Sequence, residues 1–319
     1  MDNSHLEAKK SKSDCCTIIV TYNGEKWIKN CFYTLFSSTY PTDVIVIDNG
    51  STDNTVKILE EYTGQIQLIK TGQNLGFGGA NNIGIKLGLD QGYKYFFLLN
   101  QDTWIESNAI ELLVKGINEH KEYGILSPIH VNGQMNAFDR NFKKFVKRYK
   151  TVSTPFNEAE LARHESPIDV GFVNAAAWMI SKKCIEEVGV FSPLFYHYAE
   201  DNNYCHRTLD HGFKIGIIKE SIIYHDREYR NDSYSPRKDF ERETVKSMSN
   251  PLKNRTWIED FLIAVVKILE ISSKIRFYRV PGFMIWAVKE FFILRKRVRE
   301  FDGHALYNFE VDSKYSING

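Results

Sequence analysis

The chain has 319 residues, of which 43% are hydrophobic and 13% aromatic, so it can bury one large core or two modest ones. Its formal net charge of +1 gives no overall basic field, which argues against nucleic acid as a partner. The five cysteines form no C-x-x-C pair, and the N-terminus is polar and lysine-rich where a signal peptide is apolar, so a reducing, cytoplasmic compartment is expected.

Short apolar runs alternate with amphipathic stretches from residue 14 onward, after a polar segment, 1–13, that is predicted to be a disordered tail. Buried strands are predicted at 17–20, 44–47, 66–69 and 95–99, and helices at 25–36, 52–62 and 79–89. This alternation predicts an α/β fold with a mostly parallel, three-layer sheet. In such a sheet the ligand site lies at the carboxyl ends of the strands.

The pattern changes after the fourth strand. Residues 132–167 lose their periodicity and are interpreted as a long excursion over the site. Residues 170–180 are predicted to form one strand, in which the small run Ala175-Ala176-Ala177 fits either close approach of a ligand or packing against a helix. These segments complete a predicted catalytic domain at 14–240.

Residues 241–319 are predicted to form a C-terminal helical extension, with helices at 257–271 and 283–298. Neither contains the roughly 20 uncharged apolar residues that span a bilayer. From residue 267 to residue 299, lysines and arginines are interleaved with aromatic residues, a mixture that fits an anionic membrane surface. The same mixture also fits packing on the catalytic domain or on a second copy in a homodimer.

Polar residues follow the first two predicted strands, where an α/β sheet binds its ligand. Thr21 and Asn23 lie in the first turn, and Asp48 and Asn49 lie in the second. The alternative for the second turn is a structural role alone, as a turn followed by a helix N-cap. The first turn lacks G-x-G-x-x-G, which disfavours a dinucleotide-dependent oxidoreductase.

Two further loops carry chemistry. The third loop, 74–82, contains Asn74, Gly76 and Gly79 and opens a helix, so its backbone can approach a phosphate or sugar at the positive helix end. The fourth strand runs into Asn100-Gln101-Asp102. That ending either presents oxygen ligands to a hard divalent cation or caps a helix.

Glu200 and Asp201 precede a predicted helix that Gly212 ends, so one acid can cap the helix while the other faces the cleft. His225 ends a predicted strand at 221–224 and is either a metal ligand or a structural residue. Two acids and an imidazole in this layout suit general-base chemistry beside a metal.

These motifs, in this order, resemble those of the family 2 glycosyltransferases of the GT-A fold, and most closely their bacterial rhamnosyltransferase-like branch. The resemblance covers residues 15–226, and the tail beyond residue 239 is matched loosely. It implies inverting transfer of a sugar from a nucleotide-diphosphate donor to an acceptor hydroxyl. The matching residues are 18–23, 46–53, 74–82, 98–103, 189–191 and 198–201, with Arg207, Gly212 and His225.

The resemblance also implies a role for each matched position. Asp201 would be the general base, supported by Glu200. Asp102 and His225 would bind a divalent metal, Mg²⁺ or Mn²⁺, and Asn100 stands where the family has a second carboxylate. The donor would be held by Thr21, Asn23, Asp48, Asn49, Asn74, Gly76, Gly79 and Asn100.

The branch favours dTDP-L-rhamnose as the donor, with UDP-hexose or UDP-galactofuranose as alternatives. The acceptor would be a cell-surface polysaccharide or a lipid-linked glycan, which suits the cytoplasmic face of the inner membrane. A sugar-nucleotide pyrophosphorylase is a second enzymatic function to consider, but residues 21–26 lack its Gly-rich, basic loop. A nucleotide-sugar-binding protein with a disabled site is the non-enzymatic alternative, against which the intact Asp102, Asp201 and His225 count.

Overall fold

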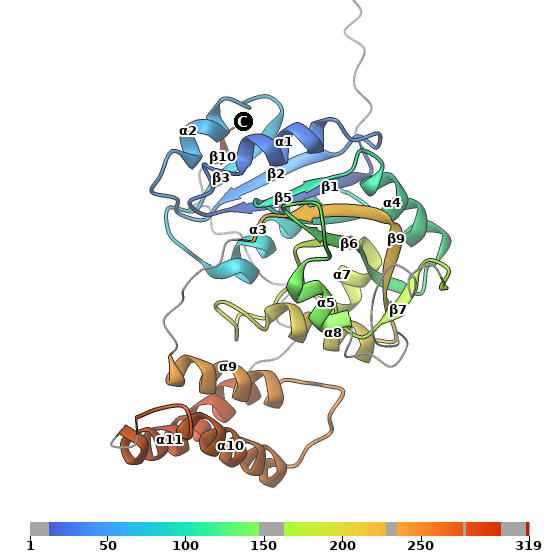
Figure 1. The fold of residues 1–319 in the computed structure, drawn as a ribbon. Helices are drawn as coiled ribbons and strands as arrows, with labels where there is room; N and C mark the ends of the chain where they lie inside the picture. Colours follow the sequence, from blue (N-terminus) through green and yellow to red (C-terminus); the bar gives the residue numbers. More distant parts are fainter. Residues whose placement is uncertain (1–12, 147–162, 228–234, 277–278, 301–316, 319) are drawn as a thin grey trace, which may run out of the picture.

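The computed structural model describes residues 13–146, 163–227, 235–276, 279–300 and 317–318. The predicted tail, apart from Ser13, and residues 147–162 of the predicted excursion lie outside these ranges. The described chain forms a twisted sheet covered by helices, with a layer of three further helices below it (Figure 1).

The first half of the sheet is parallel, as predicted. β1 pairs with β2 on one side and β4 on the other, and β2 pairs with β3. Helices connect the strands because a parallel pair needs a crossover. The elements are β1 (Cys15–Thr21), α1 (Ile28–Phe36), β2 (Asp43–Asp48), α2 (Thr55–Glu60), β3 (Ile66–Lys70), α3 (Gly76–Asp90) and β4 (Tyr95–Asn100).

Beyond β4 the sheet is mixed, so the prediction of a mostly parallel sheet applies to its first half and not to the whole sheet. The strand order is β10-β3-β2-β1-β4-β8-β6-β9-β5, with β7 paired to β9, and β8 runs antiparallel to both of its neighbours. At the far edge β10 (Ile317–Asn318) pairs antiparallel with β3. The other elements are β5 (Thr103–Ile105), α4 (Ala109–Glu119), β6 (Tyr123–Asn132), α5 (Arg140–Val146), β7 (Ile168–Val170), β8 (Ala177–Ser181), α7 (Lys182–Val188), α8 (Glu200–Asp210) and β9 (Lys214–His225).

The prediction of one strand at 170–180 is wrong. β7 ends at Val170 and β8 begins at Ala177, and a buried loop joins them. A buried apolar run has the same composition in a strand and in an interior loop, so the pattern could not separate them. Ala176 and Ala177 are buried in the core, which favours packing as the reason for their small size.

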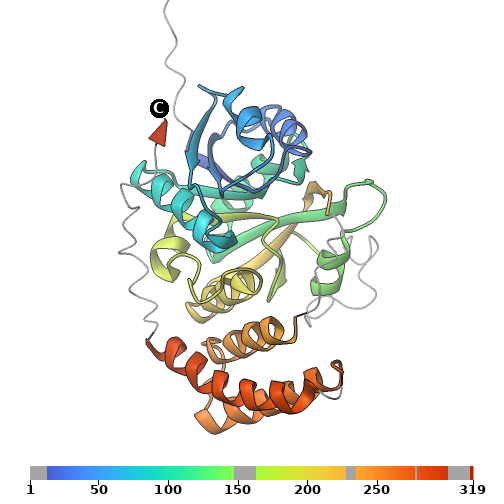
Figure 2. The ribbon, with the colours of Figure 1, turned by 90° about the vertical axis from the view of Figure 1, so that its left-hand side faces the viewer.

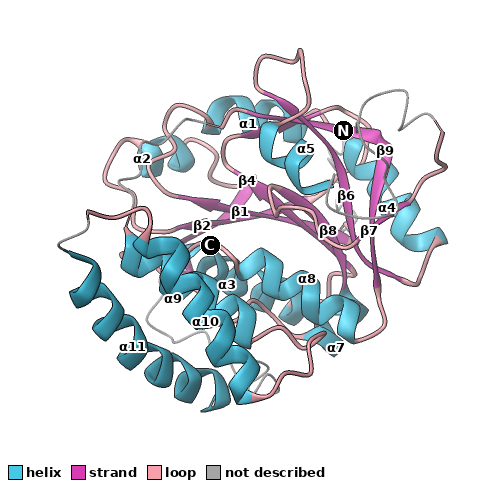
Figure 3. Cartoon of the chain, turned by 60° about the horizontal axis from the view of Figure 1, so that its bottom comes forward, coloured by secondary structure: helices cyan, strands magenta, loops and turns pink. Residues whose placement is uncertain are grey.

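Helices cover both faces of the sheet, so the three-layer α/β prediction is confirmed (Figure 3). On one face α1, α2 and α4 contribute Phe32, Leu59 and Ile110 to an apolar cluster. On the other face α3, α7 and α8 contribute apolar side chains to a second cluster, among them Ile83 and Ile185. The sheet is thus buried on both sides, as its apolar strands require.

The three C-terminal helices are α9 (Pro236–Met248), α10 (Trp257–Ser272) and α11 (Val280–Glu300). They share an apolar cluster that includes Phe240, Ile268 and Phe291. In both Figure 1 and Figure 2, α9 lies between the sheet and the α10–α11 pair. Across the described ranges, no helix has the length and apolar character to cross a membrane. The division at residue 240 stays a proposal, because α9 begins before it and continues beyond it.

Close packing of α3 on β1 gives a stability prediction. A Cβ at Gly84 would lie 2.5 Å from Cγ2 of Ile18, which is fixed in the core. We expect Gly84→Val to lower the free energy of unfolding by about 1–3 kcal/mol in urea denaturation. Gly282→Val is the control, because a Cβ there meets nothing within 4 Å, and it should change stability by less than about 0.5 kcal/mol. Equal losses in both variants would contradict this packing.

Candidate active site

The first two turns are held together by hydrogen bonds. Thr21 Oγ1 donates to Asp48 Oδ1 at 3.1 Å, and Asp48 Oδ2 accepts from the Ser51 N–H at 3.2 Å. Thr21 and Asp48 are buried beneath the turns at this edge of the sheet. Asn23 is exposed at the rim, where its Oδ1 accepts from the Thr52 N–H at 2.8 Å.

Two amides fix the third loop. Asn49 Nδ2 donates to Asn74 Oδ1 at 3.1 Å, and Asn49 Oδ1 accepts from the Leu75 N–H at 2.8 Å. Asn74 Oδ1 also accepts from the N–H of Gly76, whose φ of +77° favours glycine. Gly79 lies in the first turn of α3 that follows. Asn49 and Asn74 therefore hold the start of α3 against the end of β2.

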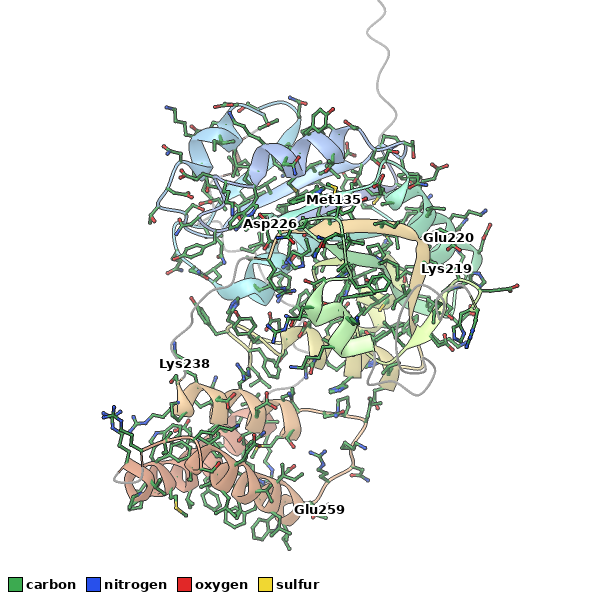
Figure 4. All side chains as sticks on the ribbon, in the orientation of Figure 1. Met135, Lys219, Glu220, Asp226, Lys238 and Glu259 are labelled. Atoms are coloured by element: carbon green, nitrogen blue, oxygen red, sulfur yellow. The ribbon has the colours of Figure 1, made fainter. Side chains whose placement is uncertain are left out.

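A cavity of about 810 Å³ opens beside these turns, a size typical of small-molecule sites. The predicted residues that line it are Asn49, Asn74, Asn100, Asp102 and His225. The predicted residues outside its lining are Thr21, Asn23, Asp48, Gly76, Gly79, Glu200 and Asp201. The wall also includes Asp226, which Figure 4 labels just past the end of β9. The other lining residues are Val20, Tyr22, Trp27, Phe77, Gln101, Arg227 and residues 132–134, 138–141 and 196–198.

Asp102 and His225 lie side by side in the cavity wall, with 3.3 Å between Asp102 Oδ1 and His225 Nε2. Burial acts to raise the pKa of Asp102, but His225 and then Arg227 outweigh it, and the pKa is lowered. Asp102 is therefore ionised at neutral pH. Arg227 lies 3.4 Å from His225 Nδ1 through Nη2, and its Nε donates to Asp139 Oδ2 at 3.4 Å.

The chemistry of this pair fits a divalent cation. A carboxylate oxygen and an imidazole nitrogen that face one cavity are both ligands that Mn²⁺ accepts, and the carboxylate also suits Mg²⁺. Among the residues that the structure describes, no group of three or more His, Cys, Asp or Glu side chains is placed to hold a metal. Asp102 and His225 thus fit a site that leaves other positions to water and phosphate oxygens.

Two contacts around the cavity were not predicted from the sequence. Gln101 Oε1 accepts from the Tyr22 N–H and its Nε2 donates to the Tyr22 carbonyl, both at 3.0 Å. Trp27 Nε1 donates to Asp226 Oδ2 at 2.9 Å. Gln101 lies between Asn100 and Asp102 in the motif at the end of the fourth strand, so its position in the sequence could have indicated it as a site residue. The Trp27–Asp226 bond joins residues 199 positions apart, and no local pattern signals it.

Glu200 and Asp201 form the first turn of α8, as predicted. Burial and the neighbouring Asp201 raise the pKa of Glu200 to about 8, and burial raises the pKa of Asp201 to about 6. Glu200 Oε2 has no hydrogen-bond partner among the described residues. The Asp201 carboxylate accepts from the backbone N–H of Asn202 and of Ala175. Burial and the repulsion between the two carboxylates therefore favour a single negative charge on the pair over two.

The segment before α8 joins the acids to the third loop. Tyr198 and Ala199 have φ values of +68° and +74°, which non-glycine residues rarely adopt. The Tyr196 hydroxyl donates to the Asn74 carbonyl at 3.1 Å. A Cβ at Gly76 would lie only 2.0 Å from the Tyr196 carbonyl oxygen. The third loop and this strained segment are therefore in direct backbone contact.

The same segment contacts the C-terminal helices. Phe195 belongs to the apolar cluster of α9, α10 and α11. Asn203 of α8 donates to the carbonyl of Ser249, just past α9, at 3.2 Å. Arg242 and Lys246 of α9 act to lower the pKa values of the two acids, although burial outweighs them. The start of α8, with the acid pair, thus lies against the helical layer formed by α9, α10 and α11.

Comparison with solved structures identifies the fold. The chain has the GT-A glycosyltransferase fold, which it shares with S. aureus TarS in complex with UDP-GlcNAc (TM-score 0.61, 16% identity, 95% of this chain and 96% of that chain). It also aligns with the mannosyltransferase PcManGT of Pyrobaculum calidifontis in complex with GDP-Man and Mn²⁺ (TM-score 0.54, 13% identity, 91% and 83% of the two chains). At these identities the likeness shows the fold alone.

The chain belongs to glycosyl transferase family 2, whose family model matches residues 16–189, more than half of its length. The low-salt glycan biosynthesis hexosyltransferase Agl10 of Haloferax volcanii is 26% identical over 259 residues, 78% of this chain and 80% of the relative. The dTDP-rhamnosyl transferase RfbF of Shigella flexneri is 27% identical over 216 residues, 67% and 69% of the two chains. The predicted glycosyltransferase class is confirmed.

Contact between Gly76 and Tyr196 gives a prediction for activity. Gly76→Ala should push the Tyr196 segment away from the third loop and lower kcat/KM for sugar transfer on the order of 10²-fold, because small displacements of a site are costly. Gly64→Ala is the matched control. Gly64 also has a positive φ, but a Cβ there meets nothing within 4 Å. Similar kcat/KM losses in both variants would mean that backbone strain alone, and not this contact, matters.

Proposed function

We propose that the chain transfers a sugar, with inversion at the anomeric carbon, from a nucleotide-diphosphate donor to a hydroxyl of a cell-surface polysaccharide or lipid-linked glycan. The observation that carries the proposal is the acid pair at the start of α8, in which Glu200 is buried, Asp201 is half-buried and both pKa values are raised, next in the chain to Tyr198 of the cavity wall. An inverting transfer needs one such base and no second nucleophile.

The donor proposed first is dTDP-L-rhamnose, and UDP-hexose or UDP-galactofuranose are the alternatives. Rhamnosyltransferases among the relatives support this order, including the O-antigen chain rhamnosyltransferase WbaN of Salmonella anatum, 25% identical over 231 residues. Family membership supports transfer over the pyrophosphorylase and binding-protein alternatives. A lipid-linked acceptor would have the enzyme work in peripheral contact with the cytoplasmic face of the membrane.

Donor binding would use the edge of the sheet around the cavity. Thr21, Asn23 and Asp48 are proposed to hold the base and ribose. They lie outside the cavity lining, and their hydrogen bonds give this edge of the sheet a fixed shape. Asn49, Asn74 and Asn100 line the cavity, and the glycines Gly76 and Gly79 let the start of α3 approach the donor.

Asp102 and His225 would hold Mn²⁺ or Mg²⁺ at the cavity wall. Such an ion neutralises charge that builds on the departing diphosphate. The Arg227 guanidinium adds a positive charge beside Asp102 and His225. An ionised Asp102 is a suitable ligand because its lowered pKa keeps the carboxylate free of a proton.

In the proposed reaction, the oxygen of the acceptor hydroxyl attacks the anomeric carbon. The Asp201 carboxylate accepts the proton that this hydroxyl loses. The bond from that carbon to the diphosphate oxygen breaks, and the nucleoside diphosphate leaves with the electron pair. Burial and the neighbouring Asp201 raise the pKa of Glu200 to about 8, which favours a neutral Glu200 beside the proposed base. The raised pKa of Asp201 makes it a stronger base than an exposed aspartate.

The base assignment predicts both a variant and a pH profile. Asp201→Asn should lower kcat by about 10²–10⁴-fold while donor affinity stays near normal. Asp210→Asn, at the exposed far end of α8, should leave kcat unchanged. For the wild type, kcat should fall as the pH drops below about 6, because Asp201 then gains a proton. An Asp201→Asn variant that keeps most of its turnover would exclude Asp201 as the base.

Donor and metal are tested by nucleoside diphosphate release from dTDP-, UDP- and GDP-sugars with Mn²⁺ or Mg²⁺. We expect release from dTDP-L-rhamnose, loss of release with a chelator, and weaker donor binding for Asp102→Ala. Asp90→Ala is the control, because Asp90 is a helix-end carboxylate on α3 paired only with Lys86 in the described contacts. Release from a UDP-sugar alone would replace the proposed donor, and chelator-resistant release would remove the metal from the proposal.

A further inference from the structure

The outer faces of α10 and α11 carry an unusual amount of exposed apolar surface. On α10 four apolar side chains, spaced four, four and three residues apart from Ile258 to Leu269, point away from the helical cluster. Ala264 and Ile268 occupy the opposite face of the helix. Val266 is 65% exposed. These outer residues are Ile258, Leu262, Val266 and Leu269. A helix that is apolar on two faces is normally covered on both.

α11 repeats this arrangement. Phe283, Ala287 and Phe291 face the helical cluster, whereas other apolar side chains three and four residues apart are exposed. Ile285 is 62% exposed, and the outer residues are Ile285, Val288 and Phe292. In Figure 4, carbon-rich side chains project from the lower side of α10 and α11, whereas Lys238 of α9 lies on the upper side. Both outer faces thus point away from the sheet.

Basic residues are interleaved with this apolar surface on α11. Lys289, Lys296 and Arg299 fall on its exposed face, and the helix has five basic and two acidic residues in all. Lys296 pairs with Glu300 at 3.6 Å, but both side chains are well exposed, so the pair is weak. On α10 the exposed Glu270 is already paired with Lys267 and Lys274. The positive charge of this surface therefore lies on α11, whereas α10 contributes apolar area together with three acidic residues and one basic residue.

We propose that the outer faces of α10 and α11 bind the surface of an anionic lipid bilayer. Apolar side chains would enter the boundary between headgroups and acyl chains, and Lys289, Lys296 and Arg299 would meet the lipid phosphates. A second copy is a poorer occupant, because a twofold interface across this face brings the cations of α11 close to their own copies. The inference rests on the proposed function, in that a lipid-linked acceptor gives the contact its purpose.

The contact also has a route to the active site. The apolar cluster under the outer faces includes Phe195, six residues before Asp201, and α9 places Arg242 and Lys246 near the acids. The helical layer that meets the lipid is thus the layer against which the catalytic acid pair is packed.

The test is co-sedimentation of the full chain with vesicles of phosphatidylcholine alone and of phosphatidylcholine mixed with phosphatidylglycerol. We expect binding to the mixed vesicles that weakens as salt is raised. Lys289→Glu/Lys296→Glu should lower the bound fraction by roughly tenfold or more. Lys57→Glu/Lys115→Glu, on exposed positions of α2 and α4, makes the same change in net charge and should bind as the wild type does.

A second pair of variants tests the apolar part. Ile285→Ser/Phe292→Ser should lose vesicle binding, whereas Tyr33→Ser, on an exposed position of α1, should keep it. Donor hydrolysis without acceptor should be unchanged in all variants, which separates a failed docking surface from a failed enzyme. Equal binding to both vesicle types, or no binding to either, would overturn the proposal. So would a dimer in sedimentation velocity that dissociates only in the Ile285→Ser/Phe292→Ser variant.

Discussion

Parallel pairing of β1 with β2 and β4 is the constraint on which the rest of the structure depends. The register places Thr21 beside Asp48 and Val20 beside Asn100, so three chain segments end at the same level. Each segment then turns, and each turn carries polar groups that need partners. These turns bond to one another, as Thr21 does to Asp48, so that polar groups far apart in the sequence share one edge of the sheet.

A second dependence runs from this edge to the C-terminal helices. The segment before α8 touches Gly76 on one side and contributes Phe195 to the cluster of α9, α10 and α11 on the other. Its strained backbone at Tyr198 and Ala199 persists because both neighbours hold it. The position of the acid pair is therefore set jointly by the third loop and by the helical layer, and a change in either reaches Glu200 and Asp201.

Local sequence patterns were enough to predict the parallel half of the fold and the turns around the cavity. Each buried strand and the polar turn that follows it are consecutive in the sequence, so a short window contains both. The run from Val170 to Ile180 misled, since an interior loop is as apolar as a strand. The bond between Trp27 and Asp226 depends on how distant segments fold together, and so does the raised pKa of Asp201. Burial is a property of the packed chain, which no short motif contains.

The central claim is that one carboxylate acts as a base in a single displacement at the anomeric carbon. The most direct test is the anomeric configuration of the sugar in the product, measured by proton NMR spectroscopy before any slow equilibration. A single displacement predicts a configuration opposite to that of the sugar in the donor. A product that keeps the donor's configuration would require either a second displacement or a different mechanism, and would contradict the role given to Asp201.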